Sequence, residues 1–439
     1  MEELCQPNRT TVDIKISSVE TMNIGSRDIV GAYLDDPEIG DETERYCLLV
    51  RGWCISRSSP LERIQLFYGN NCIADVAPFN RPDVQYAVPG EPFALRSGFS
   101  ISVSTLCLPA CGTLSLWAKL SSGIRAQIGR IELATRIPLL NHPDHLKPLI
   151  LFSVGRSGST ALMKLLTAHP EISGHMPYPL ETRFAQHSYH AMRIASSFAT
   201  SYAEDMMTSF TARRPMLGPN PSFGYFNDLD GFFHQTYAPG LIERHMEMID
   251  AFYRAQKLPG EQKPRFFAEK STQDSYVISV LDKIDGARRI MLMRDPRDIM
   301  VSIRKFNQQT GYLSFGAERV NSFAEHAELI RASIEWHLEA AGWEDERSIF
   351  LKYEDMIADW TDTATKLFGL LGIADDEDTV DQAVRVIHAE KGGEVRHTTS
   401  SSTSDSIGRW INDLEPEEKE ICAVIFDDLL EKMGYNKYH

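Results

Sequence analysis

Residues 149–166, Leu-Ile-Leu-Phe-Ser-Val-Gly-Arg-Ser-Gly-Ser-Thr-Ala-Leu-Met-Lys-Leu-Leu, decide the fold of this chain. They begin with a short apolar run, whose length suits a buried parallel strand. A loop with two glycines follows, and from Ser159 the apolar residues recur at helical spacing. A strand, a glycine-containing loop and a helix in this order form an anion site, because free N–H groups at the helix start point outward and the helix dipole favours negative charge there. The stretch therefore predicts an anion-binding loop in an α/β domain.

The loop offers both backbone and side-chain ligands. Its glycines let the backbone wrap closely around a phosphate group, and arginine and hydroxyl side chains add donors. The candidate ligands are Gly155, Arg156, Ser157, Gly158, Ser159 and Thr160. The loop is not a Walker A motif, since two residues rather than four separate its glycines and no lysine follows. Mg-ATP chemistry is therefore disfavoured, and an ordinary tight turn of small residues is the alternative.

The composition argues against several classes of protein. With 439 residues the chain has room for two or three domains. Its formal net charge of −16 disfavours broad binding to nucleic acid or to anionic membranes. The sequence has no apolar run of about 18 residues, and its first residues lack the basic and apolar regions of a signal peptide. Seven scattered cysteines suggest reduced thiols, and no Cys/His set has metal-ligand spacing, so we expect a cytoplasmic protein without a bound metal.

The chain divides into two regions with different sequence patterns. Residues 1–143 contain alternating stretches, such as 64–68 and 99–103, which predict an all-β sandwich domain. Gly-Asn-Asn at 69–71 supplies a turn after the first of these, so that 72–76 can run back as a hairpin strand. A linker with three prolines follows at 137–148. Beyond it, strand-like and helical runs alternate, so residues 144–439 are predicted to form a P-loop-like parallel sheet flanked by helices.

Some segments of this second region are expected to have particular roles. The strands after the loop are expected at 265–272, 289–294 and 348–353. Residues 185–256 are expected to cap the sheet and line a substrate pocket. Within them we expect a helix at 191–209 and a Pro/Gly/Asn-rich division at 214–224, while the Ser/Thr cluster 398–406 is expected to be a mobile loop.

A second anion site is predicted at residues 294–302, Arg-Asp-Pro-Arg-Asp-Ile-Met-Val-Ser. Arg294 stands at a strand end, and Ser302 lies one to two turns into the helix that follows. Two phosphate sites on one sheet suit a nucleotide with phosphate at both ends. Tyr353, after a later strand, is placed to stack on a base, and Arg409 lies in a further motif, Ser-Ile-Gly-Arg-Trp, at 406–410.

Together these motifs resemble the sulfotransferase family that uses 3′-phosphoadenosine 5′-phosphosulfate (PAPS). The loop at 153–160 is similar to the family's 5′-phosphosulfate loop. Arg294 and Ser302 match its 3′-phosphate pair, Tyr353 its adenine contact, and Arg409 lies in a segment similar to a cofactor-closing element. The resemblance covers residues 147–439 and is closer to the bacterial and Golgi-type glycan branches and to tyrosylprotein sulfotransferases.

The resemblance implies transfer of a sulfuryl group from PAPS to an acceptor hydroxyl, with 3′,5′-ADP as product. No metal is required, since a sulfonate carries less charge than a phosphoryl group. Arg156, and second Lys270, are the candidates for stabilising the leaving phosphate oxygen. Glu181 is the first candidate base, because Glu-Thr-Arg at 181–183 resembles a motif of tyrosylprotein sulfotransferases, and Arg183 would position the acceptor. Glu269, expected to face the same crevice, is the rival base.

Several alternatives stay open. A histidine serves as base in the cytosolic branch, so one of His169, His175, His187 and His190 is a further candidate, although a structural role is favoured for each. A sugar hydroxyl is the first expectation for the acceptor, partly because short stretches of residues 1–143 resemble modules attached to bacterial glycosyltransferases. A protein tyrosine is the second expectation. A non-catalytic nucleotide-binding scaffold on a P-loop fold and an Mg-ATP kinase are the rivals from other classes.

Overall fold

The computed structural model describes residues 12–22, 25–175, 177, 180–197, 231–256, 263–271, 273–341, 346–388 and 404–436. The predicted division at 214–224 lies outside these residues, as do most of the predicted helix at 191–209 and of the Ser/Thr cluster at 398–406. The chain forms two compact units, each described by itself below. The first consists of Met1–His142, His187–Glu247 and Ser275–Lys283, and the second of Pro143–Gln186, Met248–Asp274 and Ile284–His439.

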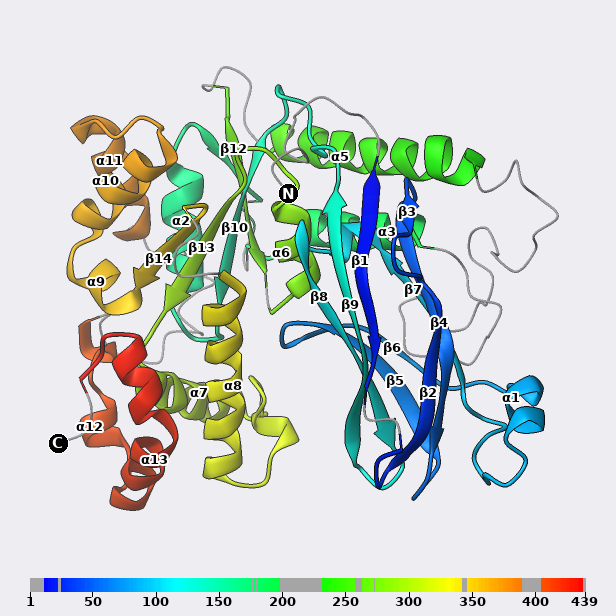
Figure 1. The fold of residues 1–439 in the computed structure, drawn as a ribbon. Coiled ribbons are helices and arrows are strands. Elements are labelled where there is room, and N and C mark those ends of the chain that lie inside the picture. The colour runs from blue at the N-terminus through cyan, green and yellow to red at the C-terminus, as the bar shows by residue number, and fades with distance from the viewer. Residues whose placement is uncertain are drawn as a thin grey trace. The chain divides into compact units, whose positions relative to one another are not determined.

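The first unit contains two antiparallel sheets (Figure 1). The larger sheet has the strand order β3-β1-β9-β8-β5-β6, with bounds Glu42–Thr43, Asp13–Thr21, Arg125–Arg136, Cys111–Leu120, Leu61–Tyr68 and Asn71–Val76. The smaller has the order β2-β4-β7, with bounds Ile29–Asp36, Cys47–Ser56 and Gly98–Ser104. The helical segments α1 (Pro82–Ala87) and η2 (Thr105–Cys107) complete this part. The all-β prediction is confirmed, whereas the more specific sandwich arrangement stays a prediction.

The alternation that predicted these strands reflects their burial. Along β5, Ile64 and Leu66 are buried while their neighbours are half-buried, as expected for a sheet with one covered face. Tyr68 pairs with Asn71 across a two-residue turn, so β5 and β6 form the expected hairpin. Gly69 adopts a φ of 54° in that turn, a backbone conformation that glycine reaches without steric cost.

Helical segments from later in the sequence also belong to the first unit. They come from α3 (Phe184–Ala195), η4 (Phe233–Tyr237), α5 (Ala238–Arg254) and α6 (Ser275–Leu281). The backbone N–H of Tyr46 donates to His234 Nδ1 at 2.9 Å, and Lys283 Nζ donates to the Leu108 carbonyl at 2.9 Å. The described residues of this stretch therefore share a unit with the antiparallel sheets, and the expected role of 185–256 as a cap and pocket lining stays a prediction. The predicted boundary between domains 1–143 and 144–439 stays a prediction.

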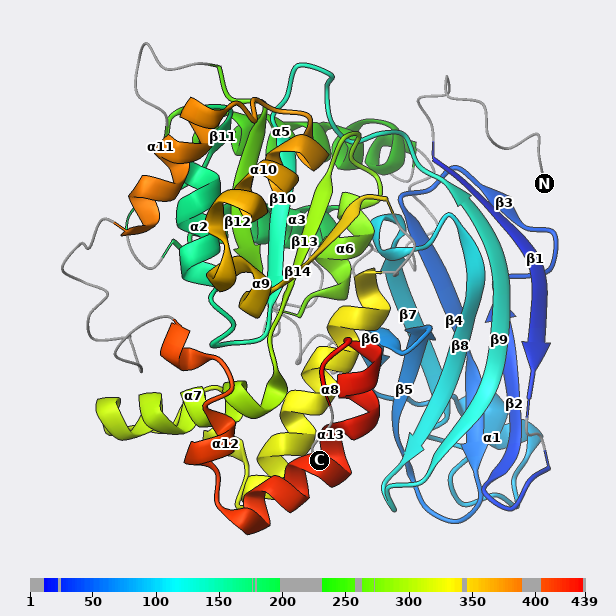
Figure 2. The same cartoon turned by 90° about the vertical axis from the view of Figure 1, so that its left-hand side faces the viewer.

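The second unit is built on a five-stranded parallel sheet with the order β11-β12-β10-β13-β14 (Figure 2). The bounds in that order are Ile172–Ser173, Phe266–Ser271, Lys147–Ser153, Arg288–Met293 and Ser348–Lys352. The apolar run that opened the sequence argument is the central strand β10, where Leu149 pairs with Ala268 and Leu151 with Ile290. The predicted α/β fold with a parallel sheet flanked by helices is therefore confirmed.

Two groups of helices bury apolar residues in this unit. The helices α2 (Ser159–Ala168), α9 (Tyr353–Ala358), α10 (Trp360–Leu371) and α11 (Glu377–His388) share one core with β10, β12, β13 and β14 (Figure 2). The helices α7 (Pro296–Thr310), α8 (Phe323–Ala341), α12 (Trp410–Asp413) and α13 (Pro416–Lys432) share another. Two short turns of helix, η5 (Ala317–Arg319) and η7 (Ser404–Ser406), lie in the connections. The loops after the carboxyl ends of the parallel strands meet at one edge of the sheet.

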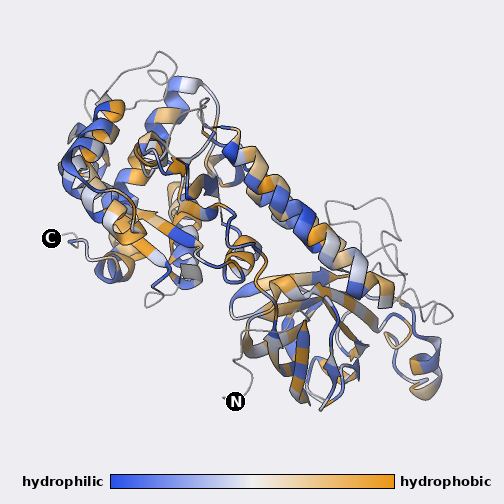
Figure 3. Ribbon diagram, turned by 90° about the horizontal axis from the view of Figure 1, so that it is seen from above, coloured by the Kyte–Doolittle hydropathy of each residue, from blue (hydrophilic) through white to orange (hydrophobic). Residues whose placement is uncertain are grey.

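The helices are amphipathic, as their sequence pattern requires. Along α5, Ile242, Met246, Ile249 and Tyr253 recur three or four residues apart and are all buried. Figure 3 shows the alternation of hydrophilic and hydrophobic residues along such helices. Within the described residues, no helix combines the length and apolar character that a bilayer crossing requires.

Candidate active site

The loop between β10 and α2 needs glycine at two positions. Gly158 precedes α2 with a φ of 85°, and a Cβ atom there would lie 2.5 Å from the ring of Tyr353. A Cβ atom on Gly155 would overlap the ring of Phe315. Arg156, with a φ of 70°, also adopts the left-handed conformation, which is uncommon for residues with a side chain. The loop is therefore held in an unusual backbone conformation between two aromatic rings.

This loop has the features of an anion cradle. The helix α2 begins at Ser159, so its first N–H groups face the loop rather than a preceding turn. The Ser157 hydroxyl is buried and has no hydrogen-bond partner among the residues that the structure describes. A buried hydroxyl without a partner is costly, and a bound anion would provide the missing acceptor. The predicted ligands therefore fit a phosphate or phosphosulfate group.

The Arg156 guanidinium links the loop to α7. Its Nε donates to Ser302 Oγ at 3.3 Å, and its central carbon lies 4.8 Å and 6.0 Å from the ring centroids of Phe306 and Phe315. Aromatic faces attract a guanidinium electrostatically, so these rings hold the cation in place. The structure thus brings together two residues that the sequence assigned to different phosphate sites.

Arg294 joins the remaining motifs. From the end of β13 it donates to the Arg156 carbonyl and to the Ser406 carbonyl, each at 2.7 Å, and its guanidinium lies 4.3 Å from the Tyr353 ring centroid. The Tyr353 hydroxyl in turn lies 2.7 Å from Ser406 Oγ. The four predicted motifs, far apart in the sequence, therefore converge at one edge of the sheet.

Arg409 adds a buried cation to this region. Its side chain lies 3.8 Å from Asp413 Oδ2. Burial, and next the neighbouring Arg294, lower the pKa of Arg409, while Asp413 and Asp298 oppose that shift. A bound anion would relieve the repulsion between the two guanidinium groups. In a chain of net charge −16, this pair provides a locally basic site.

Lys270 and Glu181 form a second polar cluster beside the loop. Lys270 lies at the end of β12 and is buried, and its Nζ donates to Thr160 Oγ1 at 3.0 Å and to Glu181 Oε1 at 3.2 Å. Arg183 approaches the other carboxylate oxygen of Glu181 at 3.3 Å. Burial lowers the pKa of Lys270, and Glu181 opposes that shift. The structure therefore places Glu181 between two cations, with 36% of its side chain exposed.

Glu269 is oriented differently from the prediction. Its carboxylate accepts hydrogen bonds from the N–H groups of Ala185 and Gln186, at 2.8 and 2.9 Å, and from the Tyr253 hydroxyl. It does not face the crevice of Glu181, because adjacent residues of a strand point to opposite faces and its neighbour Lys270 occupies that side. Burial raises the pKa of Glu269. The contacts make this carboxylate an anchor for the N-terminus of α3.

The candidate histidines differ in their surroundings. His169 is fully buried, with Nε2 2.8 Å from the Ala374 carbonyl and Nδ1 accepting from the Glu171 N–H, which is a structural arrangement. His175 Nδ1 lies 3.1 Å from Gln256 Oε1. His187 and His190 belong to the first unit, where the ring of His190 packs on Tyr276. Among the described residues, no group of three potential metal ligands is close enough to hold an ion.

Sequence reasoning missed two aromatic residues of this site. Phe306 follows Ser302 by four residues on α7, so helical spacing alone would have placed the two side chains on the same face. Phe315 has no such signal, because its contact with Gly155 joins segments far apart in the chain. Its φ of 56° is another unusual backbone conformation at this site.

A model of the sulfotransferase family matches residues 148–377, and no curated protein matches. Among solved structures, the sulfotransferase domain from the curacin biosynthetic pathway is 16% identical, with 67% of this chain and 99% of that chain covered and a TM-score of 0.39. A mouse sulfotransferase complexed with PAP is 15% identical, with 65% and 85% covered and a TM-score of 0.34. A sulfotransferase from Mycobacterium avium is 15% identical, with 68% and 79% covered and a TM-score of 0.35. Because the matched residues make up more than half of its length, the chain belongs to the sulfotransferase family.

Proposed function

We propose that this protein transfers a sulfuryl group from PAPS to an acceptor hydroxyl, and that residues 144–439 carry the activity. The observation that carries the proposal is the convergence of the loop with Arg294, Ser302 and Tyr353 through direct contacts. The family match over residues 148–377 supports the same reaction class.

Each part of the cosubstrate has a candidate set of ligands. The loop N–H groups and hydroxyls, at Gly155, Ser157, Gly158, Ser159 and Thr160, would hold the 5′-phosphosulfate. Arg294 and Ser302 would bind the 3′-phosphate, Tyr353 would contact the adenine, and Arg409 would add charge from the 404–410 segment. The buried Ser157 hydroxyl and the glycine cradle support this assignment.

The charges suggest how the residues act during transfer. The acceptor oxygen forms a bond to sulfur as the bond between sulfur and the 5′-phosphate oxygen breaks. Arg156 and Lys270 stabilise the negative charge that develops on this leaving oxygen, because fixed cations in a buried site need no reorganisation. Glu181 takes the proton of the acceptor hydroxyl, and Arg183 positions the acceptor.

Glu181 is favoured over Glu269 as the base because of its accessibility. Glu181 is partly exposed beside Lys270, whereas both oxygens of Glu269 already accept hydrogen bonds from α3 and one also from Tyr253. Glu181→Gln is expected to lower kcat about 100-fold or more while 3′,5′-ADP binds as in the wild type. Glu269→Gln serves as the matched comparison and is expected to lower the unfolding free energy instead, because an amide cannot accept all of these hydrogen bonds. The opposite pattern would reverse the assignment.

A carbohydrate or glycoconjugate hydroxyl is our proposal for the acceptor, with a protein tyrosine as the alternative. The similarity of the sequence motifs to the glycan branches supports the first, and the Glu-Thr-Arg motif at 181–183 supports the second. Incubation with labelled PAPS and matched panels of oligosaccharides and tyrosine peptides separates the two by the product that carries the label.

Thermal melting tests the cosubstrate class directly. A ligand that binds only the native state raises the melting temperature. We expect 3′,5′-ADP to raise it and ATP with Mg²⁺ to leave it unchanged. A shift with Mg-ATP alone would indicate a kinase. A shift with 3′,5′-ADP but no turnover of PAPS with any acceptor would favour a non-catalytic nucleotide-binding scaffold.

A further inference from the structure

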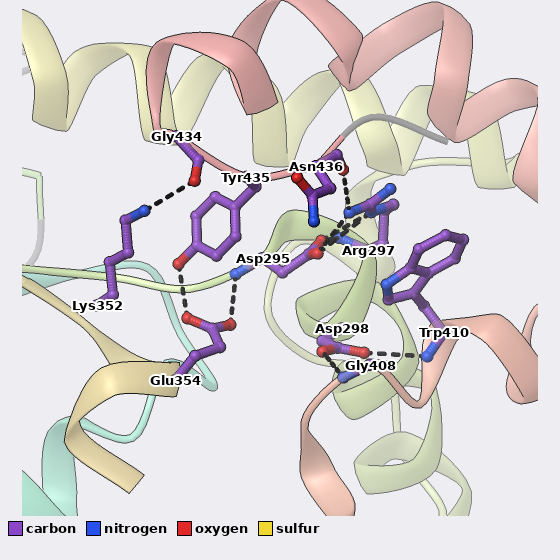
Figure 4. A network of polar contacts seen from close by, with 10 residues as sticks. All are labelled: Asp295, Arg297, Asp298, Lys352, Glu354, Gly408, Trp410, Gly434, Tyr435 and Asn436. Atoms are coloured by element: carbon purple, nitrogen blue, oxygen red, sulfur yellow. Dashed lines mark hydrogen bonds and ion pairs between the residues drawn. The ribbon is translucent and has the colours of Figure 1, made fainter. Parts of the chain in front are cut away.

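Asp298 connects two segments of the second unit that are distant in the sequence. It lies in the first turn of α7 and is 1% exposed. Its Oδ2 accepts from the Gly408 N–H at 2.7 Å, and its Oδ1 accepts from the Trp410 N–H at 3.0 Å (Figure 4). Hydrogen bonds from N–H groups to a buried carboxylate are charge-assisted and therefore stronger than neutral ones. One carboxylate thus holds the backbone on both sides of Arg409.

The neighbouring residue holds the same segment through a side chain. The Arg297 guanidinium lies 3.9 Å from the ring centroid of Trp410. It is itself fixed by an ion pair with Asp295 at 2.7 Å and by the Asn436 carbonyl at 2.9 Å (Figure 4). Consecutive residues of α7 therefore fix both the backbone and the indole ring of Trp410.

The anchored segment contributes to the candidate nucleotide site. Ser406 accepts from Arg294 through its carbonyl, and its hydroxyl lies beside the Tyr353 hydroxyl. Arg409 lies between the two backbone N–H groups that Asp298 holds. The position of both residues therefore depends on how firmly residues 406–410 are attached to α7.

We propose that Asp298 is a positioning residue for nucleotide binding, whose carboxylate fixes residues 406–410 so that Ser406 and Arg409 stand beside Arg294 and Tyr353. This inference rests on the proposed function, in which Arg294, Tyr353 and Arg409 are nucleotide ligands. Asp298 itself need not touch the nucleotide.

The electrostatics of Asp298 provide a second readout. Burial, and next the charge of Asp295, raise the pKa of Asp298 to about 6, and the hydrogen bonds from Trp410 and Gly408 and the charge of Arg294 oppose that shift. Arg409, on the anchored segment, also interacts electrostatically with Asp298. Protonation removes one of the two acceptor oxygens, so affinity for 3′,5′-ADP is expected to fall in the wild type as the pH drops below about 6.

Asp298→Asn is the central test. We expect calorimetry to show about tenfold weaker binding of 3′,5′-ADP at pH 7.5, since a charge-assisted hydrogen bond is lost, and no further weakening at pH 5.5. The KM of the acceptor is expected to change little, and the melting temperature of the free protein to fall, because the buried amide leaves one N–H without an acceptor. Asp298→Glu is expected to restore part of the affinity. Asp359→Asn is the control, because Asp359 is also a carboxylate that accepts from a backbone N–H, that of Asp362, but at the exposed N-cap of α10 and not at residues 406–410. Wild-type affinity in Asp298→Asn, or a loss of affinity equal to that of the control, would overturn the proposal.

Hydrogen exchange without nucleotide separates this inference from the proposed function. The Gly408 and Trp410 amides are expected to exchange faster in Asp298→Asn than in the wild type at the same pH. Asp298→Ser, which keeps a small acceptor, replaces the amide variant if that variant does not fold. If the wild type fails to bind 3′,5′-ADP, the proposed function fails, and amide exchange alone decides whether Asp298 is the anchor. Unchanged exchange at both amides would overturn the anchor whatever the nucleotide result.

Discussion

Arg156 links the loop after β10 to α7. Its guanidinium reaches Ser302 on α7 while its backbone forms the loop, and two aromatic rings restrict it. We expect Arg156→Ala to lower kcat about 100-fold or more, because a fixed donor to the developing negative charge is lost. Steady-state kinetics with labelled PAPS measure this effect. Arg125→Ala is the matched control, since Arg125 also lies over two aromatic rings, those of Phe67 and Trp117, but in the first unit. Equal effects of the two changes would contradict the role of Arg156.

Gly158 is the position where backbone and packing both exclude a side chain. Gly158→Ala would strain a residue with a φ of 85° and push a methyl group against the Tyr353 ring. Gly311, with a φ of 77°, has no atom within 4 Å of the position that an added methyl group would take, so Gly311→Ala introduces the strain alone. The left-handed conformation costs roughly 1–2 kcal/mol for a residue with a Cβ atom. We expect both variants to unfold at lower urea concentration, and only Gly158→Ala to lose 3′,5′-ADP binding in calorimetry. Retained binding in Gly158→Ala would show that the loop tolerates a displaced Tyr353.

Some individual residues of the candidate site were predicted from the sequence, and others were not. The candidates Arg156, Ser302, Arg294 and Tyr353 were found from local motifs, and the structure brings them together. Glu269 was predicted to face the crevice of Glu181, although the alternation of side chains along a strand already separates it from Lys270. Phe315 was not predictable, because nothing in its neighbourhood indicates a contact with Gly155.

At the scale of elements, α8 contains a buried ionisable group, His337, that has no role in the proposed mechanism. Burial lowers the pKa of His337 to about 4, and its Nδ1 lies 2.7 Å from the Ser333 carbonyl one turn earlier. The unfolded chain binds a proton near pH 6.5, whereas the folded protein does so only near pH 4. The unfolded state therefore holds more protons in this window, and stability rises with pH across it.

The low pKa of His337 in the folded protein predicts that the unfolding free energy falls in acid because of this residue of α8. The contribution of His337 to the unfolding free energy is expected to fall by about 3 kcal/mol between pH 7 and pH 4. Urea unfolding at several pH values measures the slope in the wild type and in His337→Phe, which cannot titrate. We expect a shallower slope in the variant between pH 6.5 and pH 4. If the unfolding free energy depends on pH equally in the wild type and in the variant, groups other than His337 cause the loss of stability in acid.

Elements also differ in how far the sequence predicts them. The strands β10, β12, β13 and β14 were predicted to within one or two residues, because each contains a short apolar run that can be recognised from neighbouring residues alone. The hairpin of β5 and β6 was predicted from its turn residues. The anchoring of residues 406–410 on α7 was not predicted, because the acceptor Asp298 and the donors Gly408 and Trp410 are more than one hundred residues apart.

At the scale of the whole molecule, the first unit draws on three separate stretches of the chain. Removal of residues 1–142 would leave His234 and Lys283 without the backbone partners that they have at Tyr46 and Leu108. It would also remove the hydroxyl of Ser104 that lies 2.6 Å from Ser196. Buried apolar residues of the remaining segments, such as Phe233 and Val280, would lose the part of their unit formed by residues 1–142, so we expect the truncated protein to be less soluble than the full chain and to melt at a lower temperature.

A second truncation serves as the control for this experiment. Removal of residues 1–11 alone leaves each of these contacts in place, and we expect it to behave as the full chain does. The soluble fraction after expression and the melting temperature are measured for both truncated proteins and for the full chain. A soluble protein of residues 143–439 that binds 3′,5′-ADP would show that the sulfotransferase region folds on its own, as the sequence-based domain boundary implies.

The interleaving of the two units has a consequence for synthesis. The first unit ends with Ser275–Lys283, whereas the second begins at Pro143. A ribosome that makes the chain from its N-terminus has therefore released two stretches of the second unit, Pro143–Gln186 and Met248–Asp274, before the first can be completed. Domains usually fold one after another as they emerge, but here neither unit can finish before the other has begun. The strands of the first unit are therefore made well before its last segment, and the unit stays incomplete until Lys283 has left the ribosome.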